Sequence, residues 1–162
     1  MIMKKIFLGI GTNLGNRENN LREVVIKIEE HIGNVLHASS VYETAPWGFN
    51  AENDFLNMVV KVETVYSPSE LLKRVLMIES MLGRTRSEGQ YTSRVIDIDI
   101  LLYEDQVFDD KDLKIPHPLM HKRKFVLVPL CEIAPEMLHP VLKESFTALL
   151  DSCNDTNKVM KY

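Results

Sequence analysis

The sequence is poor in several features that mark specialised classes of protein. It contains two cysteines, Cys131 and Cys153, with no C-x-x-C spacing and no evident secretory leader, so we expect free thiols in a reducing cytoplasm. Long hydrophobic runs are also lacking, because the apolar stretch at residues 6–10 is far too short for a signal peptide or a membrane span. The formal net charge is −4, so the whole chain lacks the excess of positive charge that is typical of nucleic-acid-binding proteins. We therefore expect a cytoplasmic protein with no nucleic-acid and no membrane partner.

The composition is that of an ordinary globular domain. Of the 162 residues, 45% are hydrophobic and 26% are charged. A chain of this length can bury about two thirds of its extended surface. No repeat, low-complexity tract or linker interrupts it. We expect one domain over residues 1–162, with a polar and frayed tail from about residue 153.

Hydrophobic periodicity predicts alternating strands and helices. The expected strands are residues 5–11, 35–44, 55–65 and 94–102, and the expected helices are residues 21–32 and 67–82, the second with a capping box in Ser67-Pro68-Ser69-Glu70. A hairpin near residues 104–105 and helices at 122–131 and 145–150 follow. The order β-α-β-β-α-β is typical of a ferredoxin-like α+β sandwich, in which helices cover one face of a largely antiparallel sheet.

The most informative segment is RVIDIDILL at residues 94–102. Asp97 and Asp99 alternate with isoleucines, so in a strand they share one face, roughly 7 Å apart at Cα. Two such charges repel unless a cation lies between them, and Mg²⁺ prefers carboxylate oxygens together with substrate phosphates. A solvated strand face is the alternative if the strand is considered alone.

Three arginines directly precede the aspartates: Arg84, Arg86 and Arg94. Guanidinium groups bind phosphate oxygens in pairs, so this cluster beside a metal-binding carboxylate pair suits a polyphosphate. The alternative is a set of exposed ion pairs with acidic neighbours such as Glu79, which would contribute little. The segment that holds Tyr91 has no apolar periodicity and is expected to be mobile.

Several motifs occur in the order found in one enzyme family. They are FLGIGTNLGN at 7–16, SVYET at 40–44, FLN at 55–57, GRTR at 83–86, RVIDIDIL at 94–101 and IPHP at 115–118. Over about residues 5–140 they closely resemble the 6-hydroxymethyl-7,8-dihydropterin pyrophosphokinases of folate biosynthesis. The Arg-x-x-Asp-x-Asp segment is the most specific of these motifs.

The resemblance implies a reaction and a set of site residues. The reaction is transfer of pyrophosphate from ATP to the hydroxymethyl group of the pterin, with release of AMP, on a ferredoxin-like fold that is a monomer or weak dimer. Two Mg²⁺ ions would be held by Asp97 and Asp99, which with Arg84 and Arg94 form the implied catalytic set. The implied ATP-binding residues are Glu79, Arg84, Arg86, Tyr91, Arg94, Ile100, His117 and Arg123. The implied pterin-binding residues are Thr44, Ala45, Trp47, Phe55, Asn57, Tyr91, Asp97 and Phe125.

The chemistry of these side chains agrees with such substrates. Pterin is a flat heterocycle with an amide edge, so Phe55 and Phe125 can stack on its two faces and the Asn57 carboxamide can match its edge. Phosphoryl transfer needs positioning and charge neutralisation rather than a protein nucleophile. The acceptor of the hydroxyl proton stays open between Asp97 and a metal-bound hydroxide.

The chain departs from the family at a few positions. Tyr91, Thr92 and Ser93 stand where a tryptophan, a glycine and a proline are common, and Ser87 replaces a residue that is often basic. These changes bear on loop closure and ATP affinity rather than on the type of reaction.

Other sites and functions are weaker interpretations of the same residues. Gly9, Gly11 and Gly15 give G-x-G-x-x-x-G, one residue longer than the dinucleotide fingerprint, and instead favour close approach of the backbone to a strand or substrate. His117 and His121 lack a third zinc ligand nearby, and Trp47 can also be a hydrophobic plug. A nucleotidyltransferase would attack the α-phosphorus and release pyrophosphate. A non-catalytic ligand-binding module would have no use for adjacent carboxylates.

Overall fold

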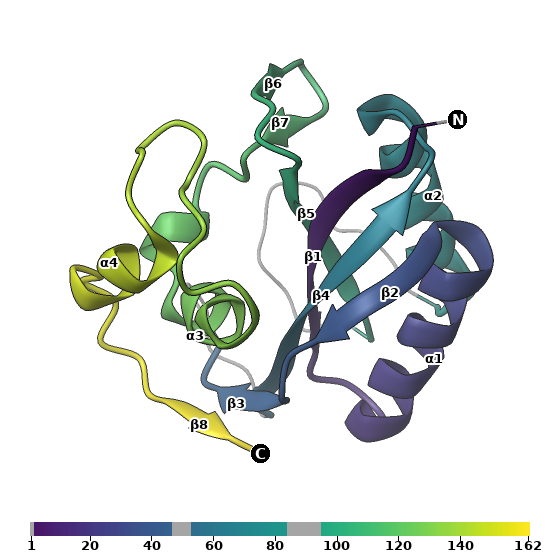
Figure 1. Cartoon of the computed structure of the whole chain (residues 1–162). Helices are drawn as coiled ribbons and strands as arrows, with labels where there is room; N and C mark the ends of the chain where they lie inside the picture. The colour runs from purple at the N-terminus through teal and green to yellow at the C-terminus, as the bar shows by residue number, and fades with distance from the viewer. Residues whose placement is uncertain (1, 47–52, 84–94) are drawn as a thin grey trace.

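An antiparallel sheet forms the centre of the computed structural model, which describes residues 2–46, 53–83 and 95–162 (Figure 1). Within these ranges six strands make up the sheet: β1 (Lys4–Thr12), β2 (Gly33–Ala38), β3 (Tyr42–Thr44), β4 (Phe55–Thr64), β5 (Asp97–Tyr103) and β8 (Val159–Lys161). The hydrogen-bonded order is β5-β1-β4-β3-β8, and β2 also pairs with β4. Strands β6 (Phe108–Asp109) and β7 (Lys114–Ile115) form a separate hairpin.

Helices cover both faces of this sheet (Figure 1). Helices α1 (Arg17–His31) and α2 (Pro68–Met81) pack on one face, and α3 (Lys124–Ile133) and α4 (Phe146–Asp151) pack on the other, next to the short 3₁₀ helix η1 (Met120–Lys122). In the described part of the chain, no helix combines the length and the apolar composition that crossing a membrane requires.

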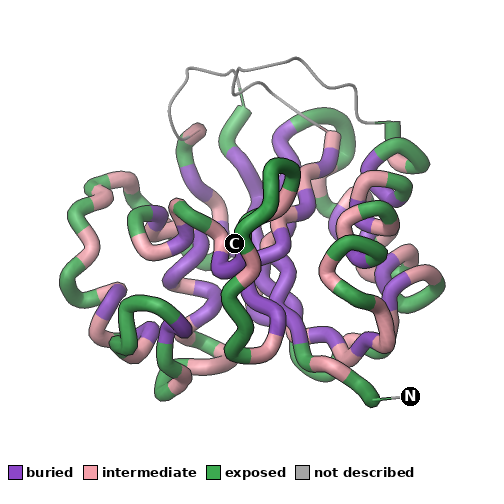
Figure 2. Tube along the Cα trace, turned by 90° about the horizontal axis from the view of Figure 1, so that it is seen from above, coloured by how far each residue is buried: buried purple, intermediate pink, exposed green. Residues whose placement is uncertain are grey.

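Alternation along the strands supplies both faces with apolar side chains. In β1, Ile6 and Leu8 belong to the core under α1 and α2, whereas Phe7 belongs to the core under α3 and α4. Val59 of β4 joins Phe7 on the second face. The expectation of helices on one face only is therefore wrong, because these second-face side chains require a cover. Figure 2 shows the buried residues gathered along the central strands, between the two helical layers.

Strand β5 contains a β-bulge near its middle. Leu8 pairs with Ile100 and the preceding Phe7 pairs with Leu102, so Leu101 has no partner position on β1. Leu101 and Leu102 consequently both face α3 and α4, and Tyr103 faces the other core. Before the bulge, the alternation leaves Asp97 and Asp99 on the α3 side of the sheet.

Capping side chains fix where the first two helices begin. The Ser67 hydroxyl accepts a hydrogen bond from the Glu70 backbone N–H at 3.3 Å, and the Glu70 carboxylate accepts one from the Ser67 N–H at 3.1 Å. This pair confirms the predicted capping box. Asn16 caps α1 in the same manner, through an acceptor bond from the Asn19 N–H at 3.0 Å.

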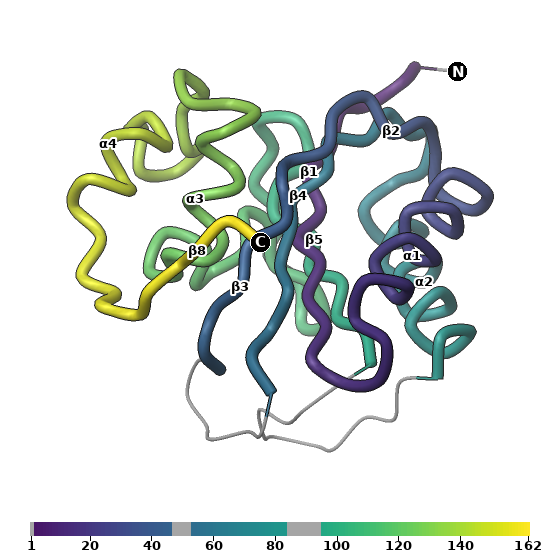
Figure 3. Tube along the Cα trace, turned by 90° about the horizontal axis from the view of Figure 1, so that it is seen from below, coloured from purple at the N-terminus to yellow at the C-terminus, as the bar shows by residue number. Residues whose placement is uncertain are grey.

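The end of the chain is more ordered than its composition suggests. Residues Val159–Lys161 form β8, which pairs with β3 from Tyr42↔Lys161 to Thr44↔Val159 (Figure 3). The Tyr162 backbone N–H donates to the Val41 carbonyl at 2.9 Å. The prediction of a frayed tail from about residue 153 is wrong for these residues, because the open edge of β3 offers backbone partners that do not depend on apolar side chains.

Two other local predictions need correction. Residues 35–44 form two strands, β2 and β3, rather than one extended segment, since the pairing with β4 is interrupted after Ala38. Near residues 104–105 the chain makes a turn, with Glu104 at φ 50°, but the strands that pair are β6 and β7 farther along. The remaining predicted helices and strands agree with the structure to within a few residues.

Candidate active site

A cavity opens on the α3 side of the sheet, with about 610 Å³ of space when the part open to solvent is included. Its walls come from β1, β3, β4, β5 and the first turn of α3. The lining residues are Gly9, Ile10, Gly11, Thr44, Ala45, Phe55, Asn57, Met58, Val59, Asp97, Asp99, Arg123, Phe125 and Val126. The structure therefore brings together Asp97, Asp99, Arg123 and five of the predicted pterin-binding side chains.

The two aspartates lie opposite glycines on the neighbouring strand. Asp97 pairs with Gly11 and Asp99 pairs with Gly9 across the β1–β5 ladder. Because neither glycine carries a side chain, the face of the sheet beside the carboxylates stays open. The paired carboxylates are thus partly exposed and point into the cavity, as the alternation of β5 predicts.

Gly11 also determines how close the opposite wall can approach. A Cβ built at Gly11 would lie 3.0 Å from the Asn57 Oδ1 and 3.5 Å from the Phe55 Cδ1. The first distance is tighter than nearly all real Cβ contacts. Gly11 is therefore a close-approach position, which agrees with the second interpretation of the glycine motif.

The Asn57 carboxamide has a fixed orientation. Its Nδ2 donates to the Thr44 Oγ1 at 2.8 Å, and both residues are buried. With the amide nitrogen committed to Thr44, the oxygen faces Gly11 at the edge of the cavity. Asn57 can therefore present a hydrogen-bond acceptor to the donor groups of a flat ligand.

Aromatic side chains reach the cavity from two different elements. Phe55 begins β4 and Phe125 lies in the first turn of α3, on the other wall. Arg123, one residue before α3, lies with its guanidinium carbon 5.7 Å from the centre of the Phe125 ring. An aromatic wall on each side of an open, partly polar cavity suits a planar heterocycle.

Positive charge stands next to the carboxylates. Arg123 is buried, and its Nη1 lies 4.0 Å from the Asp99 Oδ2. A buried guanidinium close to a carboxylate can also contact phosphate oxygens that a ligand brings to the site.

His117 is held as a neutral imidazole. Burial, followed by the nearby Arg123 charge, lowers the pKa of His117 to about 4, against an opposing effect from Asp97. Its Nδ1 accepts a hydrogen bond from the Leu119 N–H at 3.1 Å. The proton of the neutral ring therefore sits on Nε2, which can donate to an oxygen of a ligand.

Some predicted residues lie away from the cavity lining. Glu79 is buried on α2, where its Oε2 accepts a hydrogen bond from the Ile98 N–H at 2.9 Å, so it contacts β5 between the two aspartates. The Ile100 side chain packs in the core under α1 and α2. Five further predicted residues lie outside the described part of the chain: Trp47, Arg84, Arg86, Tyr91 and Arg94.

Other lining residues were not predicted from the sequence. Val59 follows Phe55 and Asn57 at two-residue spacing on β4, so strand alternation could have found it. Val126 depends on how α3 docks against the sheet, and no sequence pattern carries that information.

The Asp97 and Asp99 carboxylates suit an open Mg²⁺ site better than a site in which protein side chains enclose the metal ion. Within residues 2–46, 53–83 and 95–162, no three His, Cys, Asp or Glu side chains gather closely enough to enclose an ion. Mg²⁺ in nucleotide sites uses one or two carboxylates and completes its shell with phosphate oxygens and water. Asp97 and Asp99, side by side at an open cavity, are the two carboxylates that such a site would use.

Comparison with known sequences assigns the family. The chain matches the family model of the 7,8-dihydro-6-hydroxymethylpterin-pyrophosphokinases (HPPK) over residues 7–135. A relative from Aquifex aeolicus, named 2-amino-4-hydroxy-6-hydroxymethyldihydropteridine pyrophosphokinase, is 40% identical over 142 residues, which are 88% of this chain and 88% of that protein. A relative of the same name from Bacillus subtilis is 40% identical over 146 residues, covering 90% of this chain and 84% of that protein.

Solved structures agree in fold. A crystal structure of HPPK-DHPS in complex with substrates matches 94% of this chain with a TM-score of 0.78 at 16% identity. The wild-type HPPK-DHPS of Plasmodium falciparum with SDX-DHP matches 91% with a TM-score of 0.75 at 20% identity. This chain spans 43% of each of those two chains.

These matches define the protein as an enzyme, a transferase of the pyrophosphokinase class. The chain belongs to the 7,8-dihydro-6-hydroxymethylpterin-pyrophosphokinase family. The resemblance drawn from the sequence motifs is thereby confirmed.

Proposed function

We propose that the protein transfers the terminal pyrophosphoryl group of ATP to the hydroxymethyl oxygen of 6-hydroxymethyl-7,8-dihydropterin, releasing AMP, as a step of folate synthesis. The names of the relatives support the acceptor and the class of reaction. The observation that carries the proposal is that Asp97 and Asp99 open into the same cavity as Asn57 and two phenylalanines. One cavity thus offers a metal-binding edge beside a site for a flat ring.

On the pterin side, Phe55 and Phe125 would stack on the two faces of the ring. The Asn57 oxygen, oriented by Thr44, would accept a hydrogen bond from the amide edge of the pterin. Trp47 and Ala45 are proposed to border the ring as well. Stacking between rigid aromatic side chains buries the heterocycle at a low loss of side-chain entropy.

On the nucleotide side, Asp97 and Asp99 are proposed to hold two Mg²⁺ ions. When bound, these ions would neutralise the negative charge that develops on the phosphates during transfer. Arg123 would donate to phosphate oxygens, and the neutral His117 would donate through Nε2–H. Glu79, Arg84, Arg86, Tyr91, Arg94 and Ile100 remain proposed members of the ATP site.

The proposed reaction is an in-line displacement at the β-phosphorus of ATP. The hydroxymethyl oxygen forms a bond to that phosphorus, and the bond from the phosphorus to the oxygen that bridges the α and β positions breaks. The bridging oxygen leaves with AMP. The hydroxyl proton must be accepted by a base, and Asp97 is the candidate from this chain because it lies on the cavity edge.

Several finer assignments accompany the proposal. The element order β1-α1-β2-β4-α2-β5 and the strand order β5-β1-β4-β2 support a ferredoxin-like core. The free thiols of Cys131 and Cys153 support a reducing, cytoplasmic location. We further propose that the protein is a monomer or a weak dimer.

The test is an assay of AMP with Mg²⁺, ATP and the hydroxymethyl pterin. We expect AMP to form only when the pterin is present, and the double variant Asp97→Asn with Asp99→Asn to abolish its formation. Asp109→Asn is the matched control, since Asp109 is exposed and pairs with Lys114 on the separate β6–β7 hairpin at 3.0 Å. Release of pyrophosphate would instead indicate a nucleotidyltransferase, and equal AMP without pterin would indicate a hydrolase.

A further inference from the structure

Arg17, the first residue of α1, joins the two strands that carry the pterin side of the cavity. Its Nη1 lies 2.8 Å from the Glu43 Oε2 and donates to the Asp54 carbonyl at 2.9 Å. Glu43 directly precedes Thr44 at the end of β3, and Asp54 directly precedes Phe55 at the start of β4. One guanidinium therefore connects the chain on both sides of the Thr44–Phe55 pair of the sheet.

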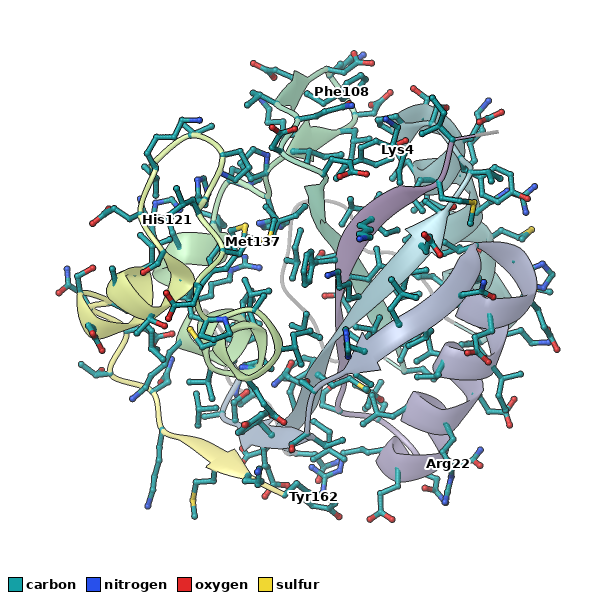
Figure 4. The ribbon with its side chains drawn as sticks, viewed as in Figure 1. Lys4, Arg22, Phe108, His121, Met137 and Tyr162 are labelled. Atoms are coloured by element: carbon teal, nitrogen blue, oxygen red, sulfur yellow. The ribbon has the colours of Figure 1, made fainter. Side chains whose placement is uncertain are left out.

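A second contact places Arg17 against Tyr162, which directly follows β8. The guanidinium carbon of Arg17 lies 5.8 Å from the centre of the Tyr162 ring, within the range of a cation–π contact. The Tyr162 hydroxyl donates to the Glu18 Oε1 at 2.6 Å, and its backbone N–H donates to the Val41 carbonyl at 2.9 Å. Tyr162 is labelled in Figure 4 at the lower end of the sheet, where β8 and β3 lie together.

A third contact supports the same region from Asn13, which directly follows β1. The Asn13 Nδ2 donates to the Asn53 carbonyl at 3.3 Å. Asn13 and Arg17 thus donate to two successive carbonyls, those of Asn53 and Asp54, just before β4 begins.

The position of Arg17 in the first turn of α1 indicates that its charge does not stabilise the helix. The N-terminus of a helix carries a partial positive charge, so its first turn prefers acidic side chains such as Glu18. A cation at this position opposes that preference. Its side chain turns toward β3 and β4 instead, where it remains only 24% exposed.

We propose that Arg17 is a positioning residue for pterin binding. It fixes the separation of the ends of β3 and β4, so that Thr44 holds the Asn57 carboxamide and Phe55 faces the ring. The inference rests on the proposed pterin substrate. Arg123 directly precedes α3 and the two aspartates lie on β5, so we expect nucleotide binding not to depend on this contact.

The test compares Arg17→Met with Lys27→Met. Lys27 is a matched control, because it lies on the same helix and pairs with Glu30 at the same distance of 2.8 Å, without contacting β3 or β4. For Arg17→Met we expect the KM for the pterin to rise about three- to tenfold, with the KM for ATP within about twofold of wild type. Arg17→Lys retains the charge and should recover part of the loss, and Lys27→Met should leave both constants unchanged.

Direct binding separates positioning from a general loss of folding. The pterin Kd is measured by fluorescence in the presence of Mg²⁺ and an ATP analogue with a methylene group between the α and β phosphorus atoms. We expect the pterin Kd of Arg17→Met to rise as its KM does, and a double-mutant cycle with Glu43→Gln to be less than additive.

Three outcomes overturn the inference: an unchanged pterin KM in Arg17→Met, an equal rise in both KM values, or the same effect in Lys27→Met. These outcomes leave the proposed function intact as long as wild type makes AMP only with the pterin. A wild-type enzyme that forms no pterin-dependent AMP overturns the proposed function, and the positioning role with it.

Discussion

The two faces of the central sheet are built from the same strands but differ in what they enclose. Toward α1 and α2, the side chains of Ile6, Leu8 and Ile10 from β1 belong to a closed core. Toward α3, the alternate positions of β1 are Phe7, Gly9 and Gly11, and only Phe7 fills core volume. The cavity therefore exists because large side chains are missing from one face of a strand that is fully packed on the other.

The same contrast holds on β5. Ile98 and Ile100 face the closed core, whereas Asp97 and Asp99 face the cavity. Carboxylates are stable there because the opposite glycines leave them open to water and to ligands. This division between a face that forms a closed core and a face that also carries the proposed site means that substitutions on the two faces should affect different properties.

The largest effect is expected on the cavity face. Asp99→Asn removes one carboxylate without changing the shape of the side chain, so we expect kcat to fall about 10²- to 10³-fold because one of the two proposed Mg²⁺ ligands is lost. The free energy of unfolding should change by only about 0.5 kcal/mol, since the residue is partly exposed. Steady-state kinetics and urea unfolding of the same preparation measure both. A large loss of stability with little loss of kcat would contradict the division.

The converse experiment alters the closed face. Leu8→Ala removes a fully buried side chain and should lower the free energy of unfolding by about 2–5 kcal/mol. Folded enzyme should retain the wild-type KM for both substrates at a temperature where it is intact. Leu36→Ala, at a leucine that is 38% exposed on β2, is the control and should have a much smaller effect on unfolding.

A single methyl group added to β1 should separate the effects of its two cavity-facing glycines. Gly11→Ala would place a Cβ against the Asn57 oxygen, so we expect the KM for the pterin to rise by roughly tenfold, equivalent to about 1.4 kcal/mol. Gly9→Ala should raise it less, because the atoms nearest to a Cβ at Gly9 belong to the Leu101 side chain and lie no closer than 3.4 Å. Equal effects of the two substitutions would show that crowding of Asn57 is not the cause.

The smallest expected effect concerns pH. The folded protein depresses the pKa of His117 to about 4, below the unfolded value near 6.5. Between these values the unfolded chain binds a proton that the folded chain does not, so stability falls as the pH is lowered through this window. His117→Gln should lessen the fall by about 1 kcal/mol.

Urea unfolding at pH 7 and at pH 5.5 measures this difference. His37→Gln, at an exposed histidine of β2, provides the control. A His117→Gln variant whose stability falls as steeply as that of wild type would contradict the assignment.

Strong local patterns made much of the fold predictable. The capping box at Ser67 and the alternation in β5 each depend on residues close together in sequence, and both agree with the structure. The helices on the second face were harder to place, because Phe7, Val59 and Leu101 give no sign of which later helix will cover them. Strand β8 was missed for a related reason, since its pairing with β3 uses backbone groups and polar composition masks it.

The candidate site likewise contains residues that the sequence predicts and residues that only the folded structure reveals. The aspartate pair followed from spacing alone, and Phe55, Asn57 and Phe125 followed from the family motifs. Arg17 could not be foreseen, because its partners Glu43, Asp54 and Tyr162 lie far along the chain and meet only after the sheet has formed. Sequence patterns therefore indicate the side chains proposed to do the chemistry more readily than the side chains proposed to position them.

The bulge at Leu101 allows one short strand to satisfy two incompatible demands. Before the bulge, the odd-numbered side chains are the partly exposed Asp97 and Asp99. After it, the odd-numbered Tyr103 is buried in the apolar core, where its hydroxyl donates a hydrogen bond to the Tyr66 carbonyl at 2.8 Å. Without that extra residue, the alternation of side chains would continue unchanged along β5. The Tyr103 ring would then face α3 in place of Leu102. Transplanting the acidic motif into another scaffold therefore requires the irregularity to be carried along with it.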